Sequence, residues 1–124
     1  MRIFKLIAIA VIASFFPKTI FAAYGEEDYI GDVRTVQVWY VVYDIEGNRI
    51  GSISNQEGEL VGFSDQIIVL SKFNFYYFYN TELERYMQKA KDSIGEIISV
   101  QSNGFIAERN GRRIRYNIDG EEVR

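Results

Sequence analysis

The residues of this sequence that could carry acid–base chemistry are its carboxylates, because the chain has neither histidine nor cysteine. Thiol nucleophiles, imidazole bases and the usual zinc ligands are therefore missing. A glycoside hydrolase needs two carboxyl groups facing each other across a cleft, one with a raised pKa. The available acids are Asp44, Glu46, Glu59, Glu82 and Glu96. They lie beside turns or at matching positions of an internal repeat, and no loop has the calcium-binding EF-hand spacing. We expect no catalytic residue, no cofactor and no metal site.

A second group of candidates is a cluster of arginines around the Asn110-Gly111 turn, the one basic patch of an acidic sequence. Guanidinium groups bind carboxylates and phosphates in bidentate fashion. The binding candidates in this cluster are Arg112, Arg113 and Arg115, with Arg109 close by. The alternative is a solvated hairpin in which the arginines pair across strands and protect a sheet edge. The acidic partners in that case are Glu108, Asp119, Glu121 and Glu122.

The third group lies in strands dense in aromatic residues, which favour binding surfaces because they combine apolar area with a polar tip. Tyr40, Tyr76 and Phe78 share one predicted strand face and could form a platform for sugar rings or a protein. The alternative is that this face is a second packed layer. The opposite face, which begins with Trp39 and Phe75, stays mostly apolar in all copies of the repeat and is the predicted core.

The strands that would position these residues belong to a repeat of about 36 residues. Segments 39–50, 75–86 and 112–123 align at offsets of 36 and 37 residues. A second block, 58–61, aligns with 95–98 at an offset of 37. Alternating apolar residues and turn signals such as Asn110-Gly111 predict short antiparallel strands within each copy.

The pattern Trp-x-Val-x-Tyr-Asp-x-x-Gly-x-x-Ile at residues 39–50 resembles short β repeats of the WG type, and a four-stranded meander of this length resembles a β-propeller blade. A complete propeller has at least four blades, whereas this chain holds about two and a half copies. We therefore predict an all-β fold, an antiparallel meander of about 8–10 short strands in an open or half-rolled sheet.

Residues 81–92 are ambiguous in isolation. Thr81 could cap a helix, and the charges that follow suit a helix dipole. The repeat instead aligns this segment with a turn and a strand, so we predict a strand over 84–88 and a looser connection over 89–93. A short helix within 81–92 remains the alternative.

The N-terminus has the layout of a secretory signal peptide. Arg2 and Lys5 precede an apolar run over 6–16, which is too short to span a bilayer, and small residues follow at Ala22 and Ala23. We expect cleavage after Ala22 or Ala23; a membrane anchor or a buried helix is the alternative. The predicted organisation is a signal peptide (1–23), a flexible acidic lead-in (24–32) and a single β-repeat domain (33–124).

Cleavage changes the charge balance. The 14 basic residues become 11 while all 17 acidic residues remain, so the net charge moves from −3 to about −6. An acidic chain with scattered charges repels nucleic-acid backbones, and we expect no nucleic-acid partner.

These observations together predict a non-catalytic, exported bacterial envelope protein, periplasmic or secreted, that acts as a protein- or glycan-interaction module. We expect no stable membrane span after cleavage, and a homo-oligomer is compatible with the repeat. The alternatives are a small carbohydrate-active hydrolase, or a structural component of an assembly.

Overall fold

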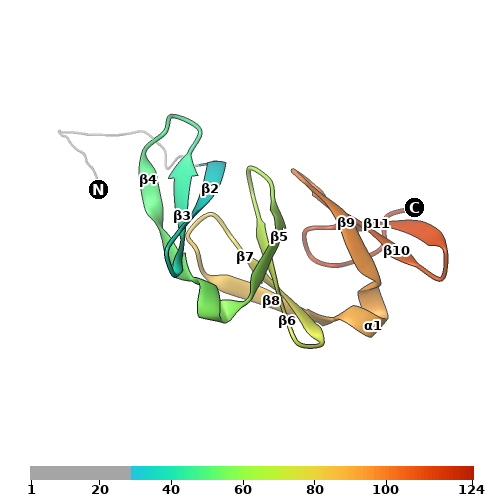
Figure 1. Cartoon of the computed structure of the whole chain (residues 1–124). Coiled ribbons are helices and arrows are strands. Elements are labelled where there is room, and N and C mark those ends of the chain that lie inside the picture. Colours follow the sequence, from blue (N-terminus) through green and yellow to red (C-terminus); the bar gives the residue numbers. More distant parts are fainter. Residues whose placement is uncertain (1–28) are drawn as a thin grey trace.

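The computed structural model describes residues 29–124, which form three antiparallel β-sheets lying in a row in chain order (Figure 1). The all-β prediction is confirmed. Strands that follow each other along the chain pair within each sheet, and the sheets remain open. The predicted signal peptide and the first residues of the predicted lead-in lie outside the described residues.

The first and third sheets have three strands each, and the middle sheet has four. The strands are β2 (Ile30–Val36), β3 (Trp39–Asp44) and β4 (Arg49–Ser54) in the first sheet, β5 (Glu59–Phe63), β6 (Ile68–Lys72), β7 (Phe75–Tyr79) and β8 (Arg85–Ala90) in the second, and β9 (Glu96–Gln101), β10 (Gly104–Arg109) and β11 (Arg112–Asn117) in the third.

Two short helical segments connect the sheets. The 3₁₀ turn η1 (Asn55–Glu57) leads from β4 to β5, and α1 (Lys91–Ile94) leads from β8 to β9. The strand predicted over 84–88 is confirmed as β8, and helix is confined to the residues that follow it. The repeat was therefore a better guide to this segment than its local helix propensity.

The lead-in prediction was wrong at its C-terminal end, because β2 begins at Ile30 instead of Val33. Ile30 is buried, and its backbone N–H donates to the carbonyl oxygen of Asp65 at 2.8 Å. This tertiary partner is far along the chain, so the acidic composition before Val33 gave no sign of it.

Two hydrophobic cores hold the sheets together, and β6 contributes to both. Ile68 and Leu70 pack in the core with residues of the first sheet, whereas Ile67 and Val69 pack in the core with residues of the third sheet. This alternation follows from the two-residue period of a strand. The middle sheet is thus covered on both faces.

The backbone of the three hairpins repeats at the spacings found in the sequence. Three turns correspond, those that join β2 to β3, β6 to β7 and β10 to β11. Each contains a residue with φ of +56°: Gln37, Phe73 and Asn110. Asp44, Asn80 and Asn117 begin the next turn, and each side-chain oxygen accepts two backbone N–H groups, from the residues two and four positions later.

The predicted assignment of strand faces was wrong at several positions. Trp39 and Phe75, predicted as core, are exposed, whereas Tyr40 and Phe78 on the opposite face are buried. The bulges of these sheets do not account for the difference, because their extra residues, Ile50 and Tyr86, lie in the partner strands β4 and β8. The physical reason is the stacking of the sheets: Tyr40 packs in the core between the first and second sheets, and Phe78 packs in the core between the second and third.

Candidate interaction surfaces

The proposed aromatic platform is not a surface. Tyr40, Tyr76 and Phe78 are buried, with Phe78 fully enclosed. The Tyr40 hydroxyl donates to the carbonyl oxygen of Gly58 at 2.7 Å, and the Tyr76 hydroxyl donates to that of Gly95 at 3.1 Å. Each phenol hydroxyl thus binds the carbonyl of the glycine that directly follows a connecting helical segment, Gly58 after η1 and Gly95 after α1. These three residues therefore belong to the packed layer that was the alternative.

The arginine candidates lie on β11, an edge strand of the third sheet. Arg112, Arg113 and Arg115 are exposed, and none of them forms an ion pair or a side-chain hydrogen bond with any residue of the described part. Arg113 stands opposite Glu108 in the register of the hairpin without an ion pair. The predicted pairing of the arginines with nearby acids is thus realised for Arg109 alone.

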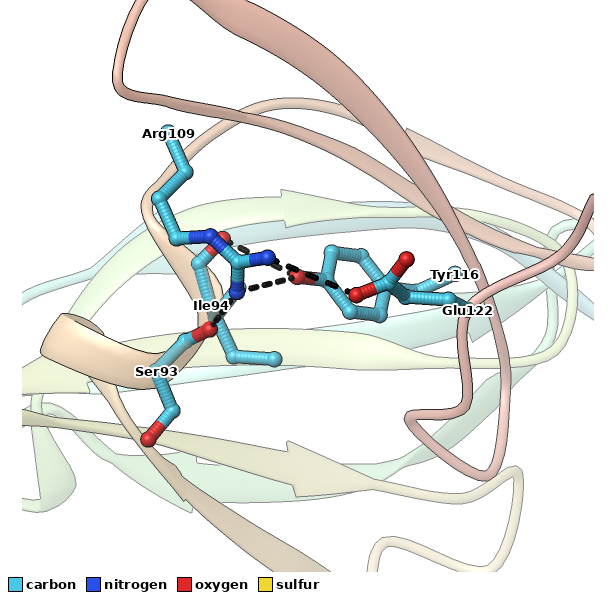
Figure 2. Close-up of polar contacts among 5 residues, drawn as sticks. All are labelled: Ser93, Ile94, Arg109, Tyr116 and Glu122. Atoms are coloured by element: carbon cyan, nitrogen blue, oxygen red, sulfur yellow. Dashed lines mark hydrogen bonds and ion pairs between the residues drawn. The ribbon is translucent and has the colours of Figure 1, made fainter.

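Arg109 ties the β10–β11 hairpin to α1 and to the C-terminal segment (Figure 2). Its guanidinium donates to the Ser93 carbonyl oxygen in α1 and to the Tyr116 hydroxyl at 3.3 Å, and it pairs with Glu122 at 3.4 Å. Tyr116 in turn donates to the carbonyl oxygen of Ile94 at 3.3 Å. This group of contacts fixes α1 against β10 and β11, so Arg109 has a structural role.

The main chain of β11 is only partly paired on its outer side. The Val123 N–H donates to the Arg115 carbonyl oxygen at 2.8 Å, and a single bridge joins Tyr116 to Glu122. The backbone C=O of Arg115 therefore points away from β10. The direction of the backbone N–H and C=O groups alternates along an antiparallel strand, so those of Arg113 also point away from β10. In the middle sheet the corresponding edge of β7 is occupied by β8, where Tyr79 faces Arg85.

A cleft of about 500 Å³ opens beside the Arg115 end of β11. Its walls combine amide and hydroxyl groups with an arginine and two aromatic rings, and they include no carboxylate side chain. The lining residues are Gln101, Ser102, Asn103, Gly104, Phe105, Arg115, Tyr116, Asn117 and Val123.

The carboxylates considered for hydrolysis are dispersed. Asp44 holds the turn after β3, while Glu59 and Glu96 begin β5 and β9. Asp44 and Glu59 line two separate clefts. Across residues 29–124, no group of three or more Asp or Glu residues is placed to hold a metal ion.

A surface that sequence reasoning missed is formed by the tips of the three hairpins, which we call the tip row: residues 36–39, 72–75 and 109–112. η1 and α1 join these tips. The Asn55 N–H binds the Val38 carbonyl at 2.8 Å and the Lys72 ammonium binds the Gln56 carbonyl at 2.8 Å, which links the first two tips through η1. The Lys91 N–H binds the Asn74 carbonyl at 2.9 Å, which together with Arg109 links the second and third tips through α1.

The first two tips expose large apolar side chains. Phe73 is 83 % exposed, Val38 54 %, Val36 48 %, Trp39 45 % and Phe75 37 %. The signal that could have found them is the alignment of Phe73 with Asn110, because a residue aligned with the first position of an Asn-Gly turn stands at a solvent-exposed hairpin tip.

Two tyrosines have shifted acidities. Burial, and then the nearby Asp119 carboxylate, raise the pKa of Tyr86 to about 12. Its hydroxyl donates to the Ile118 carbonyl oxygen at 2.7 Å and so links β8 to the last turn. Burial is also the main cause that raises the pKa of Tyr79, followed by the charge of Glu57. Both groups are neutral at physiological pH and have structural partners.

The chain matches no protein-family model, no curated protein and no solved structure. Among the described residues, no helix has the length and apolar character needed to cross a membrane.

Proposed function

We propose that this protein is a non-catalytic, exported interaction module, and that it binds an acidic, extended protein segment along β11. The observation that carries the proposal is an edge strand with three exposed arginines that have no ionic partner in residues 29–124. Export and localisation in the envelope rest on the N-terminal sequence pattern.

The main chain of β11 suits strand addition. An extended peptide binds a sheet edge by main-chain hydrogen bonds, and side chains then provide specificity. The outward groups of Arg113 are available, and the bridge between Tyr116 and Glu122 leaves the remainder of the strand toward Arg112 uncovered by described residues. The pairing of β8 on β7 shows that this kind of edge accepts a further antiparallel strand within the same chain.

The positive charge of β11 favours an acidic segment as the bound strand. Arg113 and Arg115 lie on the outer face of the third sheet, since they face Glu108 and Ile106 in register. A strand beside them would bring side chains on that face close to two guanidinium groups, and opposite charges at adjacent positions stabilise a sheet. Alternating carboxylates on the incoming segment therefore fit, and the fit gives a salt-dependent affinity.

The test uses two eight-residue probe peptides, one alternating Glu with Val and one alternating Lys with Val, added to isotope-labelled protein. We expect the acidic peptide to shift the amide signals of β11 and to slow hydrogen exchange at the Arg113 N–H. The double variant Arg113→Glu, Arg115→Glu should lose this binding, whereas Arg49→Glu, which reverses an exposed arginine on β4, should keep it. Equal binding of the basic peptide, or no change at β11, would contradict the proposal.

A glycan ligand is the second candidate, and the amide-rich cleft beside Arg115 is the observation that favours it. Polar groups that converge in a cleft can orient a small polar ligand. A set of soluble oligosaccharides, followed by the same amide signals, distinguishes the two candidates. A glycan should shift the signals of Asn103 and Asn117 and leave those of Arg113 unchanged.

A further inference from the structure

We infer that the tip row is a membrane-docking edge that places the protein on an anionic lipid surface without crossing it. This inference does not rest on the function proposed above, although Arg112, the first residue of β11, belongs to both surfaces.

The geometry of the tip row presents three hairpins to one surface. The hydrogen bonds of η1 and α1 fix each tip to its neighbour, so the tips are held as a unit. Figure 1 shows η1, α1 and the β6–β7 tip along one border of the row of sheets. A row of separate protrusions suits a lipid surface, because lipid deforms around each tip, whereas an apolar protein groove needs a continuous complementary patch.

The chemistry of the tips is that of a membrane interface. Exposed aromatic and aliphatic side chains come from the first two tips, and cations come from the second and third. The twelve tip residues hold no carboxylate, although acidic residues outnumber basic ones in the chain, and they include Lys72 and Arg112, neither of which has an ion-pair partner among residues 29–124. Arg109 also belongs to the third tip, but its charge is paired with Glu122. Aromatic rings prefer the headgroup region, and lysine or arginine beside them adds attraction to anionic lipid.

Beside Phe73 lies a cleft of about 360 Å³ whose lining includes Lys72, Phe73 and Lys91. Glu59 also contributes to its wall. The Lys72 ammonium lies 5.9 Å from the centre of the exposed Phe73 ring, and a cation beside such a ring forms a suitable position for a lipid phosphate while the ring contacts the acyl boundary.

The conformation of Phe73 points in the same direction. A bulky residue with φ of +56° is strained, whereas Asn110 takes the same φ in the third tip with a side chain that tolerates it. An exposed phenylalanine therefore occupies a position where asparagine would be more stable. Strain of this kind is retained where the side chain has a function, and an exposed ring has no packing role within the described residues that would explain it.

The experiment uses the exported, processed protein with two vesicle types, pure phosphatidylcholine and an equal mixture of phosphatidylcholine and phosphatidylglycerol. Trp39 is the single tryptophan of the chain and lies in the first tip, so its emission reports directly on this surface. We expect a blue shift with the mixed vesicles and partitioning roughly tenfold stronger than with pure phosphatidylcholine, lost in high salt.

Variants separate the tips from other surfaces. Phe73→Asn and Lys72→Glu should each weaken partitioning by roughly tenfold. Ile45→Asn removes an apolar side chain that is 66 % exposed in the turn at the opposite end of β3, and it should bind like the unaltered protein. Circular dichroism checks that each variant is folded. No blue shift with the mixed vesicles, equal binding to both vesicle types, or unchanged binding of Phe73→Asn would overturn the inference, and a protein-only surface would give the first of these results.

Discussion

The left-handed residues Phe73 and Leu83 allow the balance between backbone strain and packing to be measured within one chain. Both have positive φ, +56° and +63°. For a residue with a Cβ atom this conformation costs roughly 1–2 kcal/mol, and asparagine bears it more easily. Phe73 recovers little of that cost, because its ring is 83 % exposed and its contact with the Lys72 ammonium, 5.9 Å from the ring centre, contributes about 0.5 kcal/mol. We therefore expect Phe73→Asn to stabilise the fold by about 0.5–1 kcal/mol.

Leu83 should behave in the opposite way. Its side chain packs against the core between the first two sheets, and its Cδ1 lies 2.9 Å from where a Cβ on Gly51 would stand. Removing a half-buried leucine costs about 2–3 kcal/mol in lost contacts and cavity, which exceeds the strain released. Leu83→Asn should therefore destabilise the protein by about 1–2 kcal/mol.

Urea unfolding followed by circular dichroism measures both variants, and a change of 1 kcal/mol in a domain of this size corresponds to a melting shift of roughly 4–8 °C. Asn110→Ala is the matched control, since it places a residue with a Cβ and no local hydrogen-bonding group at the same φ and should cost about 1 kcal/mol. The reasoning would be refuted if Phe73→Asn and Leu83→Asn changed the free energy of unfolding in the same direction.

Three further outcomes follow from particular contacts. Because the folded pKa of Tyr86 is raised to about 12, above the value near 10 of an unfolded tyrosine, its contribution to stability should be complete below pH 10 and decline as pH rises toward 12. Urea titrations across that range should show a smaller decline in Tyr86→Phe than in the unaltered protein, and the part that persists in the variant includes Tyr79, whose pKa is also raised. Gly104→Ala should destabilise the third sheet by about 3 kcal/mol or more, measured by thermal unfolding, because the new Cβ would overlap the Tyr116 carbonyl oxygen. Arg109→Ala removes the contacts to Ser93, Tyr116 and Glu122 and should speed hydrogen exchange in α1 more than in β2, whereas Arg112→Ala should change neither.

Much of the local structure could be predicted from the sequence because it depends on turns and on alternation. Asn110-Gly111 forms the predicted hairpin turn, with positive φ at both residues. Residues 85–90 form a strand, as the alignment of 75–86 with 39–50 predicts, even though their composition suits a helix. Each of these predictions concerns contacts between residues that lie close together in the chain.

The division into exposed and buried faces could not be predicted in the same way. It depends on which face of each sheet stacks against its neighbour, and this has no signature in residue type. Residue type alone left Tyr40 and Phe78 either on a surface platform or in a second packed layer, and they are buried in the packed layer. Arg112, Arg113 and Arg115 are exposed, as their type predicts, because charged side chains are rarely buried without an ionic partner.

The position of β6 has a consequence for how the molecule responds to damage. Val69 and Leu70 are neighbours in the chain and both are fully enclosed, yet they belong to different cores. A packing defect in either core therefore perturbs the same five-residue strand. The first and third sheets should therefore be mechanically coupled through β6. When the two ends of the chain are pulled apart, we expect one cooperative unfolding event, controlled by the loss of β6, instead of a separate event for each sheet.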